Sequence, residues 1–231
     1  MALIDVMEYL VAPQPFAAEN HLGSLVAGTN PTYSYWDVPN HRMFLMKGLY
    51  HDPKSGVAIG GFPWDVNIVE EDFVYQWATE LSWSDPRQFK AFASKSWPNG
   101  KGGIVWCQRF VAPGAFSAPI VTADSTYNEY ASCVPGPSKT LGGPIMTKIE
   151  GPITTNLGGM LGPSQECLVQ SYFWGPGFIN MEVNYYALGF GHVQWQFWTL
   201  QNGLYDVKDV KLFNQIILGG SPAPYFPCVL P

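Results

Sequence analysis

The sequence has little charge and few cations. Only 13% of its 231 residues are Asp, Glu, Lys or Arg, compared with about a quarter in an average soluble domain. Its 12 Lys and Arg residues form no cluster, and the formal net charge is −6. Because nucleic acids and anionic lipids attract clustered positive charge, we expect no nucleic acid partner. The low charge indicates either a surface that a partner or ligand partly covers, or an ordinary neutral β-protein.

Recognisable catalytic and metal-binding motifs are also missing. The chain has no G-x-S-x-G nucleophile elbow and no G-x-x-x-x-G-K-[ST] phosphate loop. Its cysteines form no C-x-x-C pair, and the spacing of its histidines fits no common metal site. We therefore expect no metal and no cofactor. The four histidines are His21, His41, His51 and His192.

Long apolar runs, repeats and linkers are absent too. No stretch of about twenty consecutive apolar residues occurs, so we expect no transmembrane helix. Hydrophobic residues make up 47% of the chain, which excludes a mostly disordered protein. All-β folds of this length often form one domain. We predict a single domain over residues 1–231.

The four cysteines leave the disulfide state open. An even number allows two bridges with three pairings. Cys133 and Cys228 lie in Pro-rich stretches, where a bridge between them would hold the C-terminus. Cys107 and Cys167 lie within apolar, strand-like stretches and could equally be buried free thiols.

Aromatic residues are abundant, at 15% of the chain, and they dominate one stretch, Thr32–Pro53. There Tyr33 and Tyr35 alternate with other side chains in the period of two that is typical of a strand. A polar turn at Pro39-Asn40 separates this strand from a second one. Asn202-Gly203 gives a second, stronger hairpin signal near the C-terminus. These patterns predict antiparallel strands joined in sequence.

The remaining pattern predicts a mostly β fold: a curved antiparallel sheet, or half-barrel, with one or two short helices. The helices are expected over residues 2–11 and from Ser84 to Ala93, where Ser84 and Pro86 suit a helix start. Residues 112–137 are expected to be irregular, and a Pro-rich tail over 219–231 is expected to lie extended. Further strands are expected at 72–79, 104–111, 145–149, 166–174, 178–188 and 192–200.

Carboxylates in aromatic surroundings are the best candidates for chemistry. Asp65 directly follows Phe62-Pro63-Trp64, and an apolar pocket raises the pKa of a carboxyl group into the range of a general acid or base. The alternative is that Asp65 caps a turn or pairs with a cation. The carboxylates in or beside aromatic strands are Asp37, Asp65, Glu70, Glu71 and Glu182.

Cations and aromatic side chains supply further candidates. Any of four cations could hold an anionic ligand or simply lie at a solvated strand edge: Arg42, Lys47, Arg109 and Lys211. We expect about a third of the aromatic series to line a cavity for a flat or apolar ligand, and the rest to form the core. That series is Tyr33, Tyr35, Trp36, Phe44, Tyr50, Trp64, Tyr75, Trp77, Trp195 and Trp198.

Three short pieces of the chain resemble a known fold family. They are the opening hairpin from Tyr33 to Pro53 with its Gly48-Leu49-Tyr50-His51 segment, the run Phe62–Val66, and Lys211-Leu212-Phe213. Together they resemble the family that contains the violacein-pathway enzyme VioE and, more distantly, the LolA and LolB lipoprotein carriers. The fold that this resemblance implies is a strongly curved antiparallel sheet with helices on its open side.

The same resemblance implies a cofactor-free enzyme that rearranges an aromatic, indole-type substrate. In that case Asp65 takes the acid/base role and Lys211 holds a substrate carboxylate, while Tyr50 and His51 line the pocket.

Two functions are therefore weighed against each other. The first is a binding protein that holds an apolar or aromatic small molecule in the concave face of the sheet, with a homo-oligomer or larger assembly left open. The second is the cofactor-free enzyme. Lipocalin-like and lectin-like modules are a third class. The predicted ligand-binding residues are Tyr33, Tyr35, Phe44, Tyr50, His51, Trp64, Tyr75, Trp77 and Arg109.

Overall fold

A computed structural model describes residues 2–10, 16–22, 31–82, 85–94, 102–157, 164–218 and 224–229. The fold is mostly β with antiparallel pairing, as the sequence predicts. Among the described residues, α1 (Met7–Leu10) is the one α-helix. No helix in these ranges is long and apolar enough to cross a membrane.

The strands and short helical turns follow one another closely along the chain. In order they are β1 (Ile4–Asp5), α1, β2 (Phe16–Leu22), β3 (Pro31–Asp37), the 3-10 turn η1 (Val38–Asn40), β4 (Arg42–His51), β5 (Ala58–Val69), β6 (Phe73–Glu80), β7 (Phe89–Ala93), β8 (Ile104–Gln108), β9 (Phe110–Val111), β10 (Ala115–Phe116), β11 (Ile120–Thr122), β12 (Thr126–Ala131), β13 (Val134–Thr140), β14 (Ile145–Thr155), β15 (Gln165–Trp174), the 3-10 turn η3 (Pro176–Phe178), β16 (Asn180–Ala187), β17 (Gly191–Gln201) and β18 (Leu204–Leu218).

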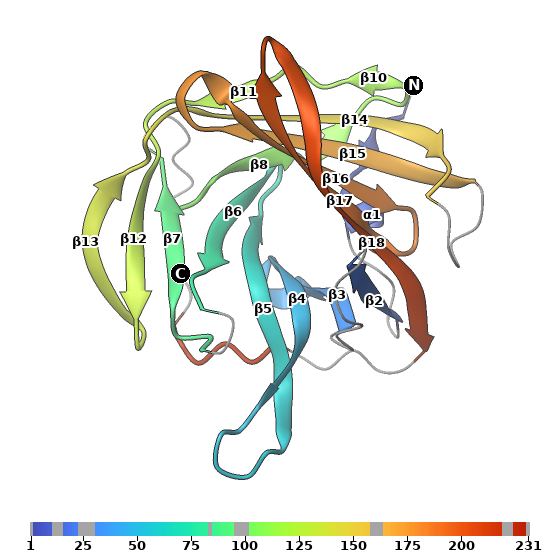
Figure 1. The fold of residues 1–231 in the computed structure, drawn as a ribbon. Helices are drawn as coiled ribbons and strands as arrows, with labels where there is room; N and C mark the ends of the chain where they lie inside the picture. The colour runs from blue at the N-terminus through green and yellow to red at the C-terminus, as the bar shows by residue number, and fades with distance from the viewer. Residues whose placement is uncertain are drawn as a thin grey trace.

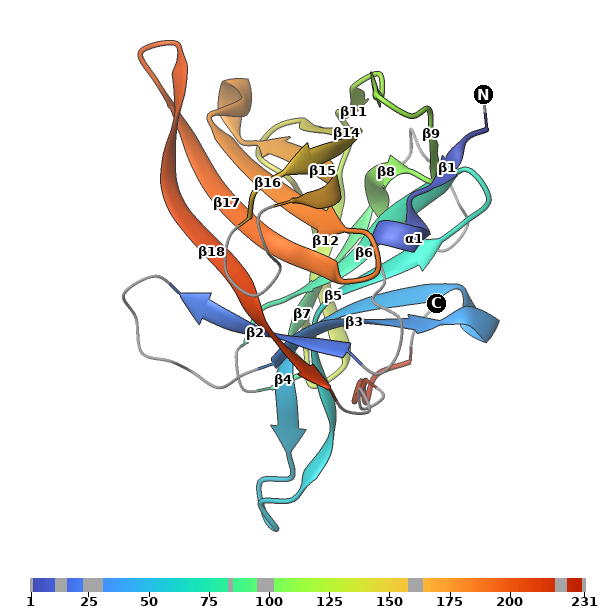
Figure 2. The ribbon, with the colours of Figure 1, turned by 90° about the vertical axis from the view of Figure 1, so that its right-hand side faces the viewer.

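Most strands belong to one large sheet with the order β10-β14-β15-β16-β17-β18-β2-β3-β4-β5-β6-β7-β12-β13. β8 pairs with β6, β11 pairs with β14, and β1 pairs with β9 in a separate ladder. Strands β14–β18 form one group and β3–β6 another, with α1 lying between them (Figures 1 and 2). No sheet in the described ranges is closed or strongly curled, so the predicted half-barrel is not seen.

The opening hairpin forms as its sequence predicts. β3 and β4 pair from Thr32↔Lys47 to Asp37↔Arg42. The turn closes when the Asn40 side chain donates a 2.8 Å hydrogen bond to the Asp37 carboxylate. The residue with left-handed backbone is His41, with φ of 53°, rather than Asn40.

The second hairpin also forms where the sequence places it. Asn202 and Gly203 both have positive φ, 52° and 82°, between the paired residues Gln201 and Leu204. This backbone is that of a two-residue primed turn, whose twist matches the flanking strands β17 and β18.

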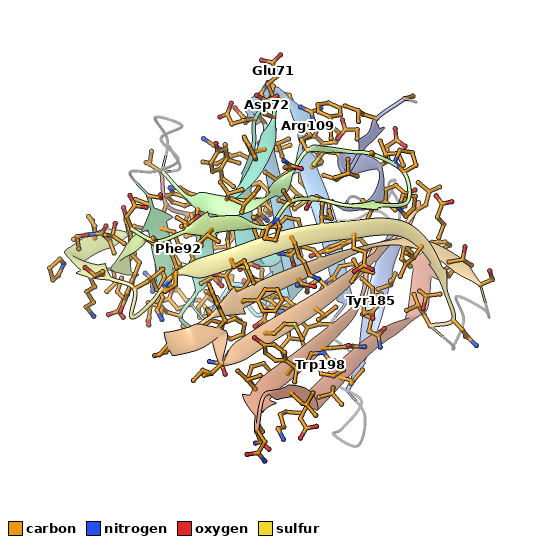
Figure 3. All side chains as sticks on the ribbon, turned by 90° about the horizontal axis from the view of Figure 1, so that it is seen from above. Glu71, Asp72, Phe92, Arg109, Tyr185 and Trp198 are labelled. Atoms are coloured by element: carbon orange, nitrogen blue, oxygen red, sulfur yellow. A yellow bond between two sulfur atoms is a disulfide. The ribbon has the colours of Figure 1, made fainter. Side chains whose placement is uncertain are left out.

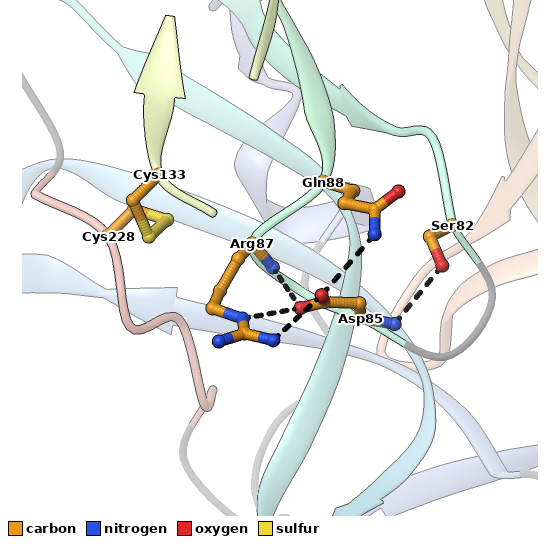
Figure 4. Close-up of polar contacts among 6 residues, drawn as sticks. All are labelled: Ser82, Asp85, Arg87, Gln88, Cys133 and Cys228. Carbon is orange, nitrogen blue, oxygen red and sulfur yellow. Dashed lines mark hydrogen bonds and ion pairs between the residues drawn. A yellow bond between two sulfur atoms is a disulfide. The ribbon is translucent and has the colours of Figure 1, made fainter. Parts of the chain in front are cut away.

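The helix predicted from Ser84 to Ala93 is wrong over its described residues, 85–93. Asp85 forms a turn instead, because its carboxylate accepts hydrogen bonds from the backbone N–H and guanidinium of Arg87 (Figure 4). Residues from Phe89 onward form β7, which pairs with both β6 and β12. Phe89 and Phe92 suggest a helical stripe by their spacing, but in the strand they face opposite, buried sides.

Residues 112–137 are more regular than predicted, because they contribute β10, β11, β12 and the start of β13. Helix 2–11 is also shorter than predicted: Ile4 and Asp5 form β1, and the helical turn begins at Met7. The Asp5 carboxylate accepts a 3.0 Å hydrogen bond from the Met7 N–H. This cap explains why the helix starts there.

Two buried clusters lie on opposite sides of β4–β6. One packs α1 against side chains of β4, β6, β8 and β14–β16. The other packs further side chains of β4–β6, with those of β7 and β8, beneath the β12–β13 hairpin and the C-terminal segment. Cys133 and Cys228 form a disulfide in this second cluster (Figure 4), whereas Cys107 and Cys167 are buried free thiols. The sequence left open whether the cysteines are bridged or free, and each state is found for one of the two pairs.

Candidate functional site

A cavity of about 500 Å³ opens between β5–β7 and β15–β17. Its volume lies within the range typical of small-molecule sites. Aromatic side chains form much of its wall, and three carboxylates and one lysine add polar groups. The lining residues are Trp64, Asp65, Gln76, Thr79, Glu80, Lys90, Phe92, Leu141, Gly142, Gly143, Ile145, Tyr172, Trp174, Gly175, Pro176, Glu182 and Trp195.

Strand pairing explains why side chains from distant parts of the chain meet here. On one wall, Tyr172 of β15 lies directly opposite Glu182 of β16, and Asn184 of β16 lies opposite Trp195 of β17. Directly opposed residues share a face of the sheet, so all four point inward. The other wall comes from β5, where Asp65 pairs with Thr79 of β6.

A smaller recess of about 40 Å³ extends the deep end of the cavity. Asp65, Tyr172 and Glu182 line both spaces, so these three polar side chains stand where the cavity and the recess meet. The recess continues to Tyr186 and His192. Asp65 itself is only 8% exposed.

The two tyrosines at this junction remain protonated. Burial raises the pKa of Tyr172, and the nearby carboxylates of Glu182 and Asp65 raise it further. Burial also raises the pKa of Tyr186, and Asp65 again contributes. A neutral phenol keeps its O–H, so each side chain can donate a hydrogen bond to a ligand or carboxylate.

His192 at the far end of the recess is neutral. Its ring stacks on Tyr186 with the centroids 4.9 Å apart. Burial lowers its pKa to about 3, although a hydrogen bond with the Gln194 backbone acts in the opposite direction. The junction therefore has no imidazolium to offset its carboxylates.

Beneath the recess, a buried hydrogen-bond network joins four strands, β8, β14, β15 and β16. The Asn184 amide donates to the Gln170 side-chain oxygen at 2.9 Å. Gln170 in turn donates to the Thr147 hydroxyl at 3.1 Å and to the Trp106 carbonyl at 3.3 Å. Satisfied buried networks of this kind hold their members in one geometry. The floor of the site is therefore preorganised.

Among the described residues that line the cavity, Lys90 is the one cation. Its ammonium nitrogen lies 5.3 Å from the Tyr127 ring centroid. A hydrogen bond from Lys139 lowers the pKa of Glu129, and the charge of Lys90 adds to that shift. The ammonium is thus already close to an aromatic face and a carboxylate on β12.

Of the residues singled out in the sequence, Asp65, Trp64, Glu182 and Trp195 line the cavity. Phe44, Tyr75 and Trp77 are instead buried in the cluster on the other side of β4–β6, and Tyr35 packs against it. The side chains of Tyr33, Tyr50 and Lys211 lie outside the part of the chain that the structure describes.

His51 and Arg109 do not belong to the cavity lining. His51 is exposed at the end of β4. The Arg109 guanidinium pairs with the Asp5 carboxylate at 2.9 Å, beside Asp72 and away from the cavity residue Phe92 (Figure 3). Arg109 thus joins β9 to β1.

Sequence reasoning missed several residues of the cavity wall. Tyr172 and Trp174 alternate in the predicted strand 166–174, which was a usable signal, but nothing local shows which face of that strand lines a space. Phe92 was missed because β7 was expected to be a helix, and Glu80 lies at the end of β6, one residue beyond the predicted strand 72–79. The glycines at 142 and 143 carry no signal of their own.

Within the described ranges, no group of three or more His, Cys, Asp or Glu side chains is arranged to hold a metal ion. Comparison with known families, with curated proteins and with solved structures found no match to this chain.

Proposed function

We propose that this protein binds an organic small molecule with a flat, apolar body in the cavity between β5–β7 and β15–β17. The observation that carries the proposal is a cavity of about 500 Å³ whose wall combines Trp64, Trp174 and Trp195 with a few convergent polar groups. Most ligand pockets combine an apolar surface with a small number of fixed polar contacts in this way.

The proposal needs no strongly curved sheet. From the sequence, we expected the ligand on the concave face of a half-barrel. A cavity between two groups of strands can also hold such a ligand. Assembly into a homo-oligomer or larger complex stays a prediction.

Fluorescence titration with Nile red, an uncharged aromatic dye, tests the proposal. We expect saturable binding, and we expect Trp174→Ala to weaken it about tenfold, since an aromatic wall contributes on the order of 1 kcal/mol or more to a stacked ligand. Trp198→Ala is the matched control, because Trp198 lies on β17 outside the cavity lining. Equal effects of the two substitutions, or no saturable binding, would contradict the proposal.

Acid–base catalysis is the second candidate, and one observation favours it. Asp65 and Glu182 come from opposite walls and meet the protonated Tyr172 at the deep end of the cavity. Paired carboxylates in different surroundings can divide acid and base roles. This candidate is the one closest to the VioE-like enzyme, with Asp65 in the acid/base role and Lys211 as its proposed partner.

Mass spectrometry of the molecule that co-purifies with the protein separates the two candidates. If the protein is an enzyme, the bound molecule is converted on incubation, and Asp65→Asn blocks conversion with little change in affinity for an uncharged substrate. A molecule recovered unchanged from both proteins supports binding alone.

A further inference from the structure

The side chains that line the cavity carry more negative than positive charge. Among the described residues of the lining, three carboxylates, those of Asp65, Glu80 and Glu182, accompany one ammonium group, that of Lys90. With all four ionised, the lining has a formal excess of two negative charges. The chain as a whole has few charged residues, at 13%, so this concentration inside one cavity is not a reflection of composition.

The single ammonium is poorly placed to neutralise the deep end. Lys90 lies close to the Tyr127 ring and to Glu129 on β12, and it does not line the recess that Asp65 and Glu182 share. No arginine lines either space. An anionic ligand would therefore meet carboxylates without a guanidinium partner, which is costly in a low-dielectric cavity.

The aromatic wall suits the opposite charge. Trp64, Trp174 and Trp195 line the same cavity as the carboxylates, and the faces of aromatic rings attract cations, tryptophan most strongly. Charge-assisted hydrogen bonds from an ammonium to a carboxylate are among the strongest polar contacts in proteins. Tyr172, which keeps its proton, can fix the orientation of one of these carboxylates. The cavity thus offers two kinds of contact that favour a cation.

We propose that the cavity selects ligands that carry a protonated amine or quaternary ammonium group on a flat apolar body. The cationic group lies at the junction between Asp65 and Glu182, and the apolar body lies against Trp174 and Trp195. This inference rests on the proposed function, because it specifies the class of ligand for the same cavity.

Isothermal titration calorimetry with three probes of the same shape tests the charge selectivity. The probes are naphthylethylamine, naphthylethanol and naphthylacetate, which are cationic, neutral and anionic at neutral pH. We expect the amine to bind at least about tenfold more tightly than the alcohol, which corresponds to about 1.4 kcal/mol, and the acetate to bind most weakly.

Substitutions at the junction sharpen the test. In the Asp65→Asn/Glu182→Gln double variant, the preference for the amine over the alcohol should fall to about onefold. Glu129→Gln is the matched control: Glu129 is a carboxylate on β12 that does not line the cavity, and the preference should survive there. Circular dichroism confirms folding, and the two single variants replace the double variant if it does not fold.

The outcomes are distinguishable. Tighter or equal binding of the alcohol or the acetate overturns the charge selectivity but leaves the proposed function standing. Binding of none of the three probes contradicts both. If the junction variants prefer the amine as strongly as the control does, the cationic group does not bind between Asp65 and Glu182. That result also overturns the inference.

Discussion

Aromatic side chains cluster on both sides of β5–β7. The outer side, toward the β12–β13 hairpin, and the inner side, toward β15–β17, differ in what covers these side chains. On the outer side, Phe89 stacks on Tyr130 with ring centroids 4.4 Å apart and contacts Phe226 at 5.1 Å. The β12–β13 hairpin and the C-terminal segment close over these rings. On the inner side, Trp174 and Trp195 lie on the two strands that pair with β16, which carries Glu182, and a cavity is left between these strands and β5–β7.

The difference shows what separates a core from a binding site in an aromatic-rich protein. Phe89 is 2% exposed and its neighbours are apolar, so close packing excludes water and stabilises the fold. Around Trp174, the carboxylates of Asp65, Glu80 and Glu182 line the cavity and oppose a dry, close-packed arrangement, because ionised groups need polar partners or water. The outer side should therefore govern stability and the inner side ligand binding.

Truncation of Phe89 should give the largest effect on stability. Phe89→Ala removes a nearly fully buried ring from the outer cluster, so the free energy of unfolding should fall by about 3 to 5 kcal/mol. Urea unfolding followed by circular dichroism measures the loss. A loss below about 1 kcal/mol would show that the outer side is not the packed core that we describe.

Removal of the disulfide should come next. Cys133 and Cys228 are separated by 95 residues in the sequence, and a bridge over so long a loop restricts the unfolded chain strongly. The Cys133→Ser/Cys228→Ser double variant should lose about 2 to 4 kcal/mol in guanidinium unfolding without reductant. Reductant should bring the wild-type protein to the value of the variant and leave the variant unchanged.

Acidification should destabilise the inner side through His192. Burial lowers the pKa of His192 to about 3, below the ordinary value of 6.5, so below pH 6.5 the unfolded chain binds a proton that the folded protein does not. The folded state then loses about 1.4 kcal/mol per pH unit, or about 2 kcal/mol by about pH 5.

Urea unfolding at pH 6.5 and at about pH 5, in wild type and in His192→Phe, isolates the contribution of His192. Phe can keep the stacking on Tyr186 but cannot titrate, so the variant should lose about 2 kcal/mol less than wild type on acidification. His51→Gln is the control at an exposed histidine, and its loss should equal that of wild type.

Truncation of Trp174 should have the smallest effect on stability. Its ring is half-buried and borders the cavity, so Trp174→Ala should cost about 1 kcal/mol in urea unfolding, well below the loss at a fully buried ring. A stability loss equal to that of Phe89→Ala would mean that the two sides do not differ as we describe.

The sequence predicts the hairpins well because their signals are local. Asn202-Gly203 requires no tertiary contact to favour its turn, and the alternation of Tyr33 and Tyr35 is visible within seven residues. The mostly β class follows from the same evidence. The order of β18, β2 and β3 in the sheet depends on long-range pairing, which no local pattern encodes.

The failures occur where tertiary contacts override local preference. Residues 89–93 form a strand because β6 and β12 both pair with them, and each of their faces is covered. The candidate site was found only in part for a related reason. Asp65 and Trp64 adjoin in sequence, whereas Glu182 meets them only because β5 and β16 belong to facing strand groups.

β13 ends one side of the large sheet, and its sequence runs Val-Pro-Gly-Pro. Neither Pro135 nor Pro137 has an amide hydrogen to offer, so a strand from another molecule would find an interrupted row of donors there. At the opposite end, β10 is only two residues long. Edge-to-edge growth of the sheet into fibres is thus discouraged at both of its described ends.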